Sequence, residues 1–427
     1  MWNVTALLCT LIGAAAPLSF FDGASTIGIV GTSASLCLVV AIFALRPGEL
    51  AFVKSTVAPP LIAGLVLPLL IVVQMLPVPW WAHPVWKSAA EALGYPLSGS
   101  VSIDTGASLG ALITYLAGLN ASIAAAAVAV DPRRANALAN AVMATSAVAA
   151  LLAVAQHVGI ATWLDHSAPI IKGQSSGLVA VVLIGIPVSV ASALETRDAS
   201  GSALHWQRRW LLILAAVLGT TSAAWSVGRG GAIPIAAGVA LVVAIWTARR
   251  LRIPVWSSLV VAVAIAGIGA ATAIALRHPD VPFAISFSQA PQGAIETTQS
   301  LLADIPPLGA GAGTIEALIP TYTDWQEPAS APVIASAASV VTAEFGAVAS
   351  WAILVVVAIG IYLLVAGALR RGKDWSFAAA AAAVLLTLVL AAFTLPTVLS
   401  PPAIAVLGAV VGSAVSQRVS RTRLKAG

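Results

Sequence analysis

Long apolar runs recur along the whole chain, separated by short polar stretches or by stretches that contain Gly and Pro. Runs of this length, rich in Ala, Leu and Val, are typical of helices that cross a bilayer, and they lack the alternation of outer-membrane strands. The pattern predicts an all-α, polytopic transmembrane bundle of about twelve spans, forming a single integral membrane domain over residues 1–427. The expected spans are 4–20, 25–45, 56–78, 107–130, 134–156, 174–195, 207–226, 230–248, 254–276, 334–369, 376–395 and 399–417.

Composition supports a membrane protein. Hydrophobic residues make up 59% of the chain and charged residues only 9%, against about 25% charged residues in soluble domains. The N-terminus has no basic stretch before its first apolar run, so we expect a retained helix and not a cleaved signal. Cys9 and Cys37 fall inside predicted spans, where we expect small buried residues. No CxxC, HExxH or Walker-type pattern is present, so the sequence suggests no metal or nucleotide cofactor.

Charge is divided unequally between the predicted loops. With both termini in the cytoplasm, the outside segments hold four of the 21 Lys and Arg residues and 11 of the 16 Asp and Glu residues. This is the positive-inside bias of a multi-pass membrane protein. The basic balance therefore describes the cytoplasmic face, and we expect no nucleic-acid partner. The four outside cations are Lys87, Lys172, Arg229 and Arg277.

The longest loops are all predicted on the outer side, at 79–106, 157–173 and 277–333. The last contains a segment with helical periodicity, 294–305, and then a glycine-rich stretch, 306–314. A structureless loop of this length would be unusual. We therefore expect a short amphipathic helix on the membrane surface followed by a glycine turn, and we expect the work of the protein on this side.

Three outside cations are candidates for binding an anion. Arg229 follows one glycine and precedes two, which would let a ligand approach the backbone closely. A guanidinium fork suits phosphate or diphosphate. Arg277 begins the long loop, and Lys172 stands at the mouth of the sixth span. The alternative is an anchor to lipid headgroups, while Lys87 is typical of a solvated helix face.

Polar and glycine residues near the tenth span form a second group of candidates. Gly309, Gly311 and Gly313 alternate in "PPLGAGAGT", which predicts a tight re-entrant turn that shapes a cavity. Glu344 lies inside the extended tenth span, where a carboxylate is either a buried structural acceptor or a proton acceptor. Asp304, just before the turn, is a loop acid whose simplest interpretation is solvation.

Four stretches resemble motifs of the bacterial O-antigen ligase and polysaccharide polymerase superfamily, and along the chain they follow the family's order: 99–108, 226–233, 301–322 and 343–351. "SVGRGGAI" (226–233) resembles its Ser-Arg-Gly signature. "LLADIPPLGAGAGTIEALIPTY" (301–322) resembles its Asp-x-Pro-Leu-Leu-Gly-x-Gly stretch followed by a Tyr, with Pro307 in place of the first Leu. "GSVSIDTGAS" (99–108) resembles the segment before its fourth span, and "AEFGAVASW" (343–351) its Ala-Glu-x-Gly.

The resemblance implies a GT-C-like, metal-independent glycosyltransferase of the bacterial inner membrane. Such proteins use undecaprenyl-diphosphate-linked glycans on the periplasmic side and need no nucleotide sugar. Arg229 and Arg277 would then hold the donor diphosphate, and their charge would offset that of the leaving group. Asp304, the three glycines of the turn and Tyr322 fall on the motif at the substrate cavity.

One departure from the family pattern affects the chemistry. The family places a His-Asn pair eight or nine residues before the glutamate of Ala-Glu-x-Gly, whereas this chain has Ala335 and Ser336 there. The candidate general base of the ligases is therefore missing. Glu344, Asp324 and Glu327 are the acids that could replace it.

Four functions remain open at this point. The first is a polymerase of exopolysaccharide or O-antigen repeat units, and the second is a ligase, which the missing histidine disfavours. The third is a lipid-linked glycan transporter or flippase, in which Gly28 and Gly31, or Pro59 and Pro60, would break helices. The fourth is an inactive scaffold that binds other polysaccharide assembly and export proteins.

Overall fold

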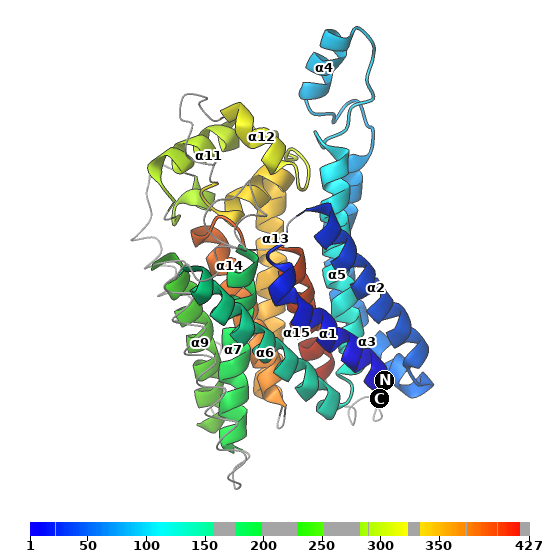
Figure 1. Cartoon of the computed structure of the whole chain (residues 1–427), viewed down its shortest axis with the longest axis vertical. Helices are drawn as coiled ribbons and strands as arrows, with labels where there is room; N and C mark the ends of the chain where they lie inside the picture. The colour runs from blue at the N-terminus through cyan, green and yellow to red at the C-terminus, as the bar shows by residue number, and fades with distance from the viewer. Residues whose placement is uncertain are drawn as a thin grey trace.

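The computed structural model describes residues 1–21, 23–157, 176–198, 229–251, 282–288, 290–322, 334–371, 374–398 and 400–418. Every regular element in these ranges is helical, as the apolar runs predict. Among the described residues, ten long helices form the bundle, and shorter ones cover one of its ends (Figure 1). We call this covered end the loop end. The opposite end, where the chain begins and where α15 finishes, is the termini end.

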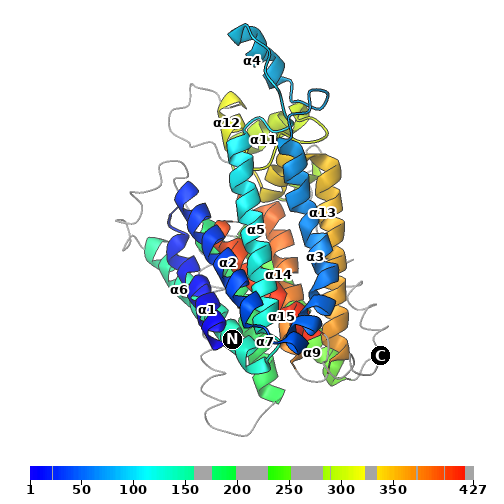
Figure 2. The ribbon, with the colours of Figure 1, turned by 90° about the vertical axis from the view of Figure 1, so that its right-hand side faces the viewer.

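The long helices are α1 (Trp2–Leu18), α2 (Ala24–Ala44), α3 (Pro47–Met75), α5 (Thr105–Val128), α6 (Pro132–His157), α7 (Ser176–Asp198), α9 (Arg229–Arg250), α13 (Ala337–Arg370), α14 (Trp375–Thr394) and α15 (Pro401–Arg418). The loop end carries α4 (Val85–Leu93), η2 (Phe283–Ile285), α11 (Gln292–Asp304) and α12 (Ile315–Tyr322). The amphipathic helix expected at 294–305 is therefore present as α11. The segment expected as a loop at 79–106 contains α4, which projects beyond the bundle in both views (Figures 1 and 2).

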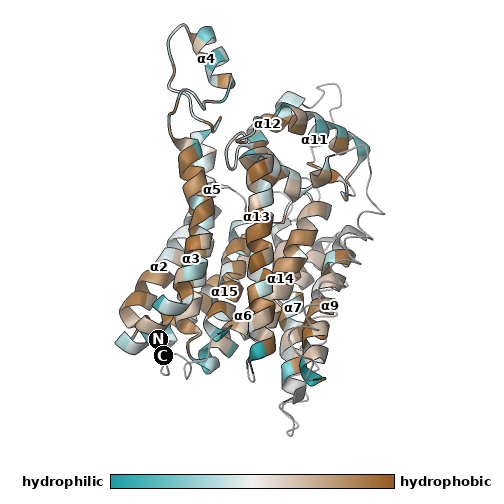
Figure 3. Cartoon of the chain, turned by 180° about the vertical axis from the view of Figure 1, so that it is seen from behind, coloured by the Kyte–Doolittle hydropathy of each residue, from teal (hydrophilic) through white to brown (hydrophobic). Residues whose placement is uncertain are grey.

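The described helices are those of a membrane protein. Within the described residues, seven helices are long and apolar enough to cross a bilayer, or eight when the bent α3 counts as one span. Apolar residues cover the helices along most of their length, and polar residues gather near the ends (Figure 3). Ten of the expected spans fall on helices. The other two, 207–226 and 254–276, lie outside the described residues.

The core of the bundle is built from small residues. The run of alanines from Ala378 to Ala383 in α14 is fully buried, with α7, α9, α13 and α15 packed around it. Close approach of α5 and α15 depends on glycine. A Cβ on Gly408 would clash with the Gly118 carbonyl, and one on Gly412 with the Ser122 carbonyl. Small residues four apart permit such backbone contact between membrane helices.

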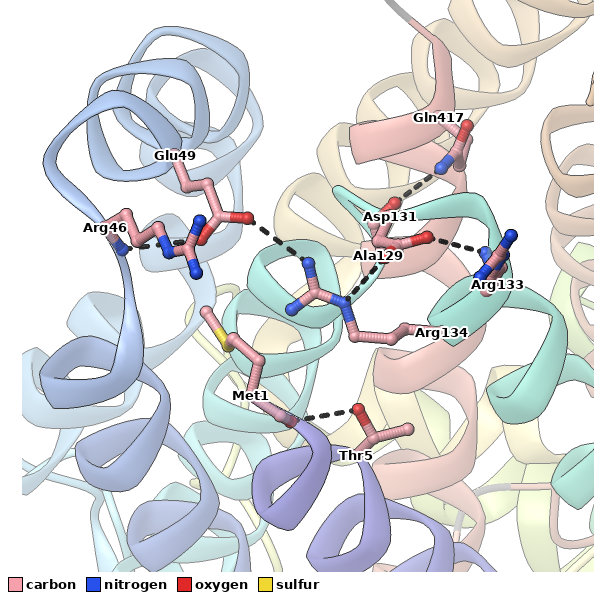
Figure 4. A network of polar contacts seen from close by, with 9 residues as sticks. All are labelled: Met1, Thr5, Arg46, Glu49, Ala129, Asp131, Arg133, Arg134 and Gln417. Atoms are coloured by element: carbon pink, nitrogen blue, oxygen red, sulfur yellow. Dashed lines mark hydrogen bonds and ion pairs between the residues drawn. The ribbon is translucent and has the colours of Figure 1, made fainter.

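Polar contacts join four helices at the termini end (Figure 4). The buried Arg134, in α6, lies 3.2 Å from the Glu49 carboxylate of α3 and 3.6 Å from Asp131. Gln417 of α15 donates to the Ala129 carbonyl at the end of α5. Partners for buried charge are needed here because an unpaired ion in an apolar setting is costly. The network fixes where α3, α5, α6 and α15 meet.

Two helices of the bundle are not straight. α3 contains Pro59, Pro60 and Pro68, and its halves meet at an angle of 56°. Proline removes a backbone donor and clashes with the preceding turn, which accounts for the bend. α13 is interrupted at Gly346, whose φ of 81° and ψ of 163° are not helical. By contrast, α2 runs unbroken through Gly28 and Gly31.

Candidate functional site at the loop end

The break in α13 creates a site for backbone hydrogen bonds. Where a helix is interrupted, the carbonyls before the break lose their partners from the next turn. Here the Ala343 carbonyl accepts from the Ala310 N–H at 2.9 Å, and the Glu344 carbonyl accepts from the Gly311 N–H at 3.1 Å. The glycine turn at 306–314 therefore replaces the missing turn of the helix.

Gln74, near the end of α3, completes this assembly. Its side chain is only 2% exposed. Its Nε2 donates to the Glu344 carbonyl at 2.8 Å and to the Leu308 carbonyl at 3.1 Å, while its Oε1 accepts from the Ala312 N–H at 3.2 Å. One amide thus uses both donors and its acceptor to join α3, the turn and α13. A buried amide is tolerated because it is fully paired.

The alternating glycines are required by both conformation and space. Gly309, Gly311 and Gly313 all have positive φ, of 78°, 106° and 74°. Side chains at these positions would be strained, and each Cβ would also meet backbone of a neighbouring segment. Gly309 and Gly346 face each other across the contact between the turn and the broken helix. The stretch thus forms a tight turn, as the glycine spacing predicts.

The segment before α5 packs on the other side of the turn. The Ile103 N–H donates to the Ala310 carbonyl at 3.1 Å, and the Ser102 N–H to the Gln74 carbonyl at 2.9 Å. Ser108 donates to the Ala312 carbonyl at 2.8 Å and contacts the Ser102 hydroxyl. The turn is therefore enclosed by α3, the start of α5 and α13.

Glu344 lies directly beneath the turn. Its side chain is 8% exposed, and its carboxylate accepts a hydrogen bond from the Gly313 N–H. Glu316 of α12 and Tyr115 of α5 are within electrostatic range. The carboxylate therefore has the buried, hydrogen-bonded setting of a structural acceptor, and it also stands where a proton acceptor would be needed if substrate binds against the turn.

Two predicted substrate-binding residues are brought together. The Tyr322 phenol at the end of α12 donates to the Asp304 carboxylate at the end of α11. Burial and the Asp304 charge raise the pKa of Tyr322, so this phenol stays protonated over the physiological range. The pair fastens the two surface helices, and Asp304 is not simply a solvated loop acid.

The positions that carry His-Asn in the resembled family are structural here. Ala335 and Ser336 are fully buried. Ser336 caps α13 by accepting from the Ser339 N–H at 3.1 Å, and it donates to the Ala284 carbonyl at 2.6 Å. The Ala335 N–H donates to Thr298 at 3.0 Å. Neither residue offers a group that could take a proton from a sugar hydroxyl.

Several candidates lie outside the described residues. They are Lys172, Arg277, Asp324 and Glu327. Arg229 is described only as the first residue of α9, which starts at the loop end. Within the described ranges, no group of His, Cys, Asp and Glu residues could hold a metal ion. Cys9 and Cys37 are free thiols.

Two cavities flank the site. One, of about 310 Å³, lies between the turn and the loop after α3 and is lined by residues 80–84, Val101 and 306–309. The other, of about 240 Å³, lies deeper between α3, α5 and α15. Its lining is mostly apolar, with Tyr115 and Ser122 among the residues that line it. The first cavity lies at the loop end, and the second lies further into the helix bundle.

Sequence reasoning missed Gln74. The available signal was an uncharged but strongly polar side chain within an otherwise apolar predicted span, 56–78. Such a residue needs a partner, since an unpaired amide in an apolar setting costs free energy. The partner could not be named because it lies 270 residues further along the chain.

Comparison with known proteins adds no assignment. No protein-family model matches the sequence, and no curated protein matches it.

Proposed function

We propose that this protein is a polymerase of undecaprenyl-diphosphate-linked oligosaccharide repeat units, acting at the periplasmic face of a bacterial inner membrane. One observation carries the proposal. Three stretches that resemble the O-antigen ligase and polymerase superfamily, 99–108, 301–322 and 343–351, meet at the loop end through direct hydrogen bonds. The loop end would then be the periplasmic face.

The path of the chain supports twelve spans with both termini in the cytoplasm. α7 finishes at the termini end, whereas α9 begins at the loop end; α9 finishes at the termini end, whereas η2 lies at the loop end (Figure 1). Spans at 207–226 and 254–276 would account for both changes of end. Apart from Arg229 at the start of α9, arginines at described helix ends, such as Arg133, Arg250 and Arg370, lie at the termini end, as the positive-inside rule requires of a cytoplasmic face.

The reaction needs an anion clamp and a proton acceptor. An acceptor hydroxyl attacks the anomeric carbon of the donor, the bond from that carbon to the diphosphate oxygen breaks, and undecaprenyl diphosphate leaves with the electron pair. Arg229 and Arg277 would stabilise the diphosphate, and Lys172 would add a third positive charge. Glu344 would take the hydroxyl proton, because it is the carboxylate held against the glycine turn.

The deeper cavity supports a lipid-linked donor. Its lining comes from α3, α5 and α15, with Pro60, Gly64 and Gly408 among the residues. Apolar side chains and glycines at this depth suit a hydrocarbon chain, which gains free energy by contact with apolar surface. Part of the isoprenoid would lie there, with the diphosphate at the loop end.

Chain extension in liposomes tests the proposal. Purified protein receives an undecaprenyl-diphosphate-linked repeat unit, and products are resolved on a gel. Arg229→Ala is compared with Arg250→Ala, because these residues begin and end the same helix, α9. Loss of a charge-assisted contact predicts a rate about 10- to 100-fold lower for Arg229→Ala and an unchanged ladder for Arg250→Ala. Equal ladders would remove Arg229 from the site, and no ladder from folded wild type would refute the polymerase.

A second pair of variants separates chemistry from structure at Glu344. Glu344→Gln keeps an oxygen that accepts from the Gly313 N–H but is no longer a base. Its control is Glu296→Gln, which changes an exposed carboxylate of α11 that bonds to Gln292. A folded Glu344→Gln protein with little activity supports proton transfer. Full activity would leave Glu344 only the task of holding the turn.

The bend in α3 favours one alternative. Broken helices are typical of transporters, and the 56° bend near Pro60 is such a feature. A flippase would move a fluorescent undecaprenyl-diphosphate glycan from one leaflet of a liposome membrane to the other without extending the glycan. This outcome, with no ladder, would replace the polymerase proposal.

A further inference from the structure

The cavity of about 310 Å³ at the loop end has an unusual lining. Two tryptophans lie beside it, Trp80 and Trp81, which are 86% and 56% exposed. The remaining lining residues are His83, three prolines and small or aliphatic residues, and none of these described residues carries a fixed charge. Its volume is at the lower end of the range of small-molecule sites, about 300–1,000 Å³.

The loop that presents these tryptophans is held in place. The backbone N–H of His83 donates to the Ser100 carbonyl at 2.9 Å, and the Trp86 indole N–H donates to the Ser102 carbonyl at 3.2 Å. Ser102 in turn bonds to the backbone of Gln74. The loop is thus tied to the assembly around the turn while both indoles remain exposed. Such exposed aromatic surface is unfavourable in water and is typical of a site that binds a ligand, a membrane or a protein partner.

The chemistry of the lining points to a neutral sugar ring. A pyranose has an apolar face of C–H bonds and hydroxyl groups around its edge. The C–H bonds are attracted to the negative face of an indole. Hydroxyls can bond to Nε2 of His83 and to backbone carbonyls. Because Nδ1 of His83 accepts from the Val85 N–H at 3.3 Å, the neutral ring carries its proton on Nε2, as a donor.

An anionic or purely lipid ligand fits this lining less well. A diphosphate needs cations, and none lines the cavity among its described residues. A hydrocarbon chain would leave the His83 donor unpaired, at a cost in free energy. The cavity also borders Pro306, Pro307 and Gly309, so a ring bound there would lie directly beside the glycine turn.

We propose that this cavity is a saccharide subsite, in which Trp80 and Trp81 stack on a neutral sugar ring of the glycan and the backbone of the glycine turn forms its floor. The proposal rests on the proposed function for the identity of the glycan. Sugar binding itself does not require catalysis.

The test measures binding without the lipid. The oligosaccharide released by mild acid from the lipid-linked glycan of the producing cells is titrated against wild-type protein in nanodiscs, with maltotriose as an unrelated sugar. Saturation-transfer NMR reports contact, and calorimetry reports affinity. We expect Trp81→Leu and Trp80→Leu each to weaken binding about tenfold, while Trp81→Phe retains most of it. Leucine keeps an apolar side chain but removes the aromatic face.

Trp2→Leu is the matched control, since Trp2 is 62% exposed and lies at the termini end. We expect it to bind as wild type does. Unchanged binding by both leucine variants would overturn the subsite and leave the tryptophans as membrane anchors. Absence of wild-type binding would also overturn it, even where chain extension persists and the polymerase stands. Binding that depends on Trp81 in a protein without chain extension would support the subsite and remove the polymerase.

Discussion

Replacement of Gln74 by leucine tests whether one amide holds the loop end together. Leucine has a similar volume, so the change removes hydrogen bonds and leaves the packing nearly intact. The three groups bonded to Gln74 fare differently. The Glu344 carbonyl keeps the Gly311 N–H, and Leu308 is 47% exposed, so its carbonyl can reach water. Ala312 is fully buried, and its N–H loses its partner.

One buried unsatisfied donor costs about 1–3 kcal/mol, so Gln74→Leu should lower the free energy of unfolding by about that amount. Unfolding is followed by circular dichroism during titration of mixed micelles with dodecyl sulfate. Hydrogen exchange at 305–314 should also accelerate. The control is Gln292→Leu on α11, where the amide is exposed and bonds only to Glu296. If both variants change stability by less than about 0.5 kcal/mol, the amide does not hold the turn, and the reasoning is refuted.

Three further predictions follow from the backbone and from one imidazole. Gly346→Ala should lower the free energy of unfolding by about 2 kcal/mol, because φ at this position is positive and the added Cβ would clash with the Pro307 backbone. Gly360→Ala, where the added Cβ meets open space, should leave stability unchanged. Thermal melting in detergent compares the two variants. Gly412→Ala should separate α5 from α15 and lower the melting temperature, with Gly13→Ala as the unaffected control. Burial lowers the pKa of His83, so its contribution to stability is full above about pH 6.5 and is lost as pH falls through the lowered value. Protection of the amides at 76–104 against hydrogen exchange, corrected for the intrinsic exchange rate, should therefore fall on acidification. His83→Gln should abolish that fall.

The order of helices was predictable because long apolar runs have few alternatives. Ten expected spans coincide with helices, and periodicity alone located α11. Both features depend on residues close together in the sequence, so the sequence alone is enough to predict them. The tenth expected span, 334–369, is extended in the sequence, but the position of its break cannot be seen there, since "AEFGAV" resembles any other helical stretch with a glycine.

The contacts of the site were not predictable for a related reason. The glycine spacing predicts a turn, yet the carbonyls that accept hydrogen bonds from this turn belong to α13, some 30 residues further along the chain. The Asp304–Tyr322 bond joins two helices whose relative placement only the fold determines. The anion-binding role of Arg229, Arg277 and Lys172 stays a prediction, as does the chemistry at Glu344.

The separation of Gln74 from Glu344 has a consequence for biosynthesis. α3 leaves the ribosome 270 residues before the carbonyl that its amide will bind. At about 5–20 residues per second, that interval lasts roughly 10 to 50 s. During this time the end of α3 holds an amide that the lipid cannot satisfy, so it must remain near water or a helper protein. Completion of the loop end is therefore a late step, which waits until α13 has been inserted.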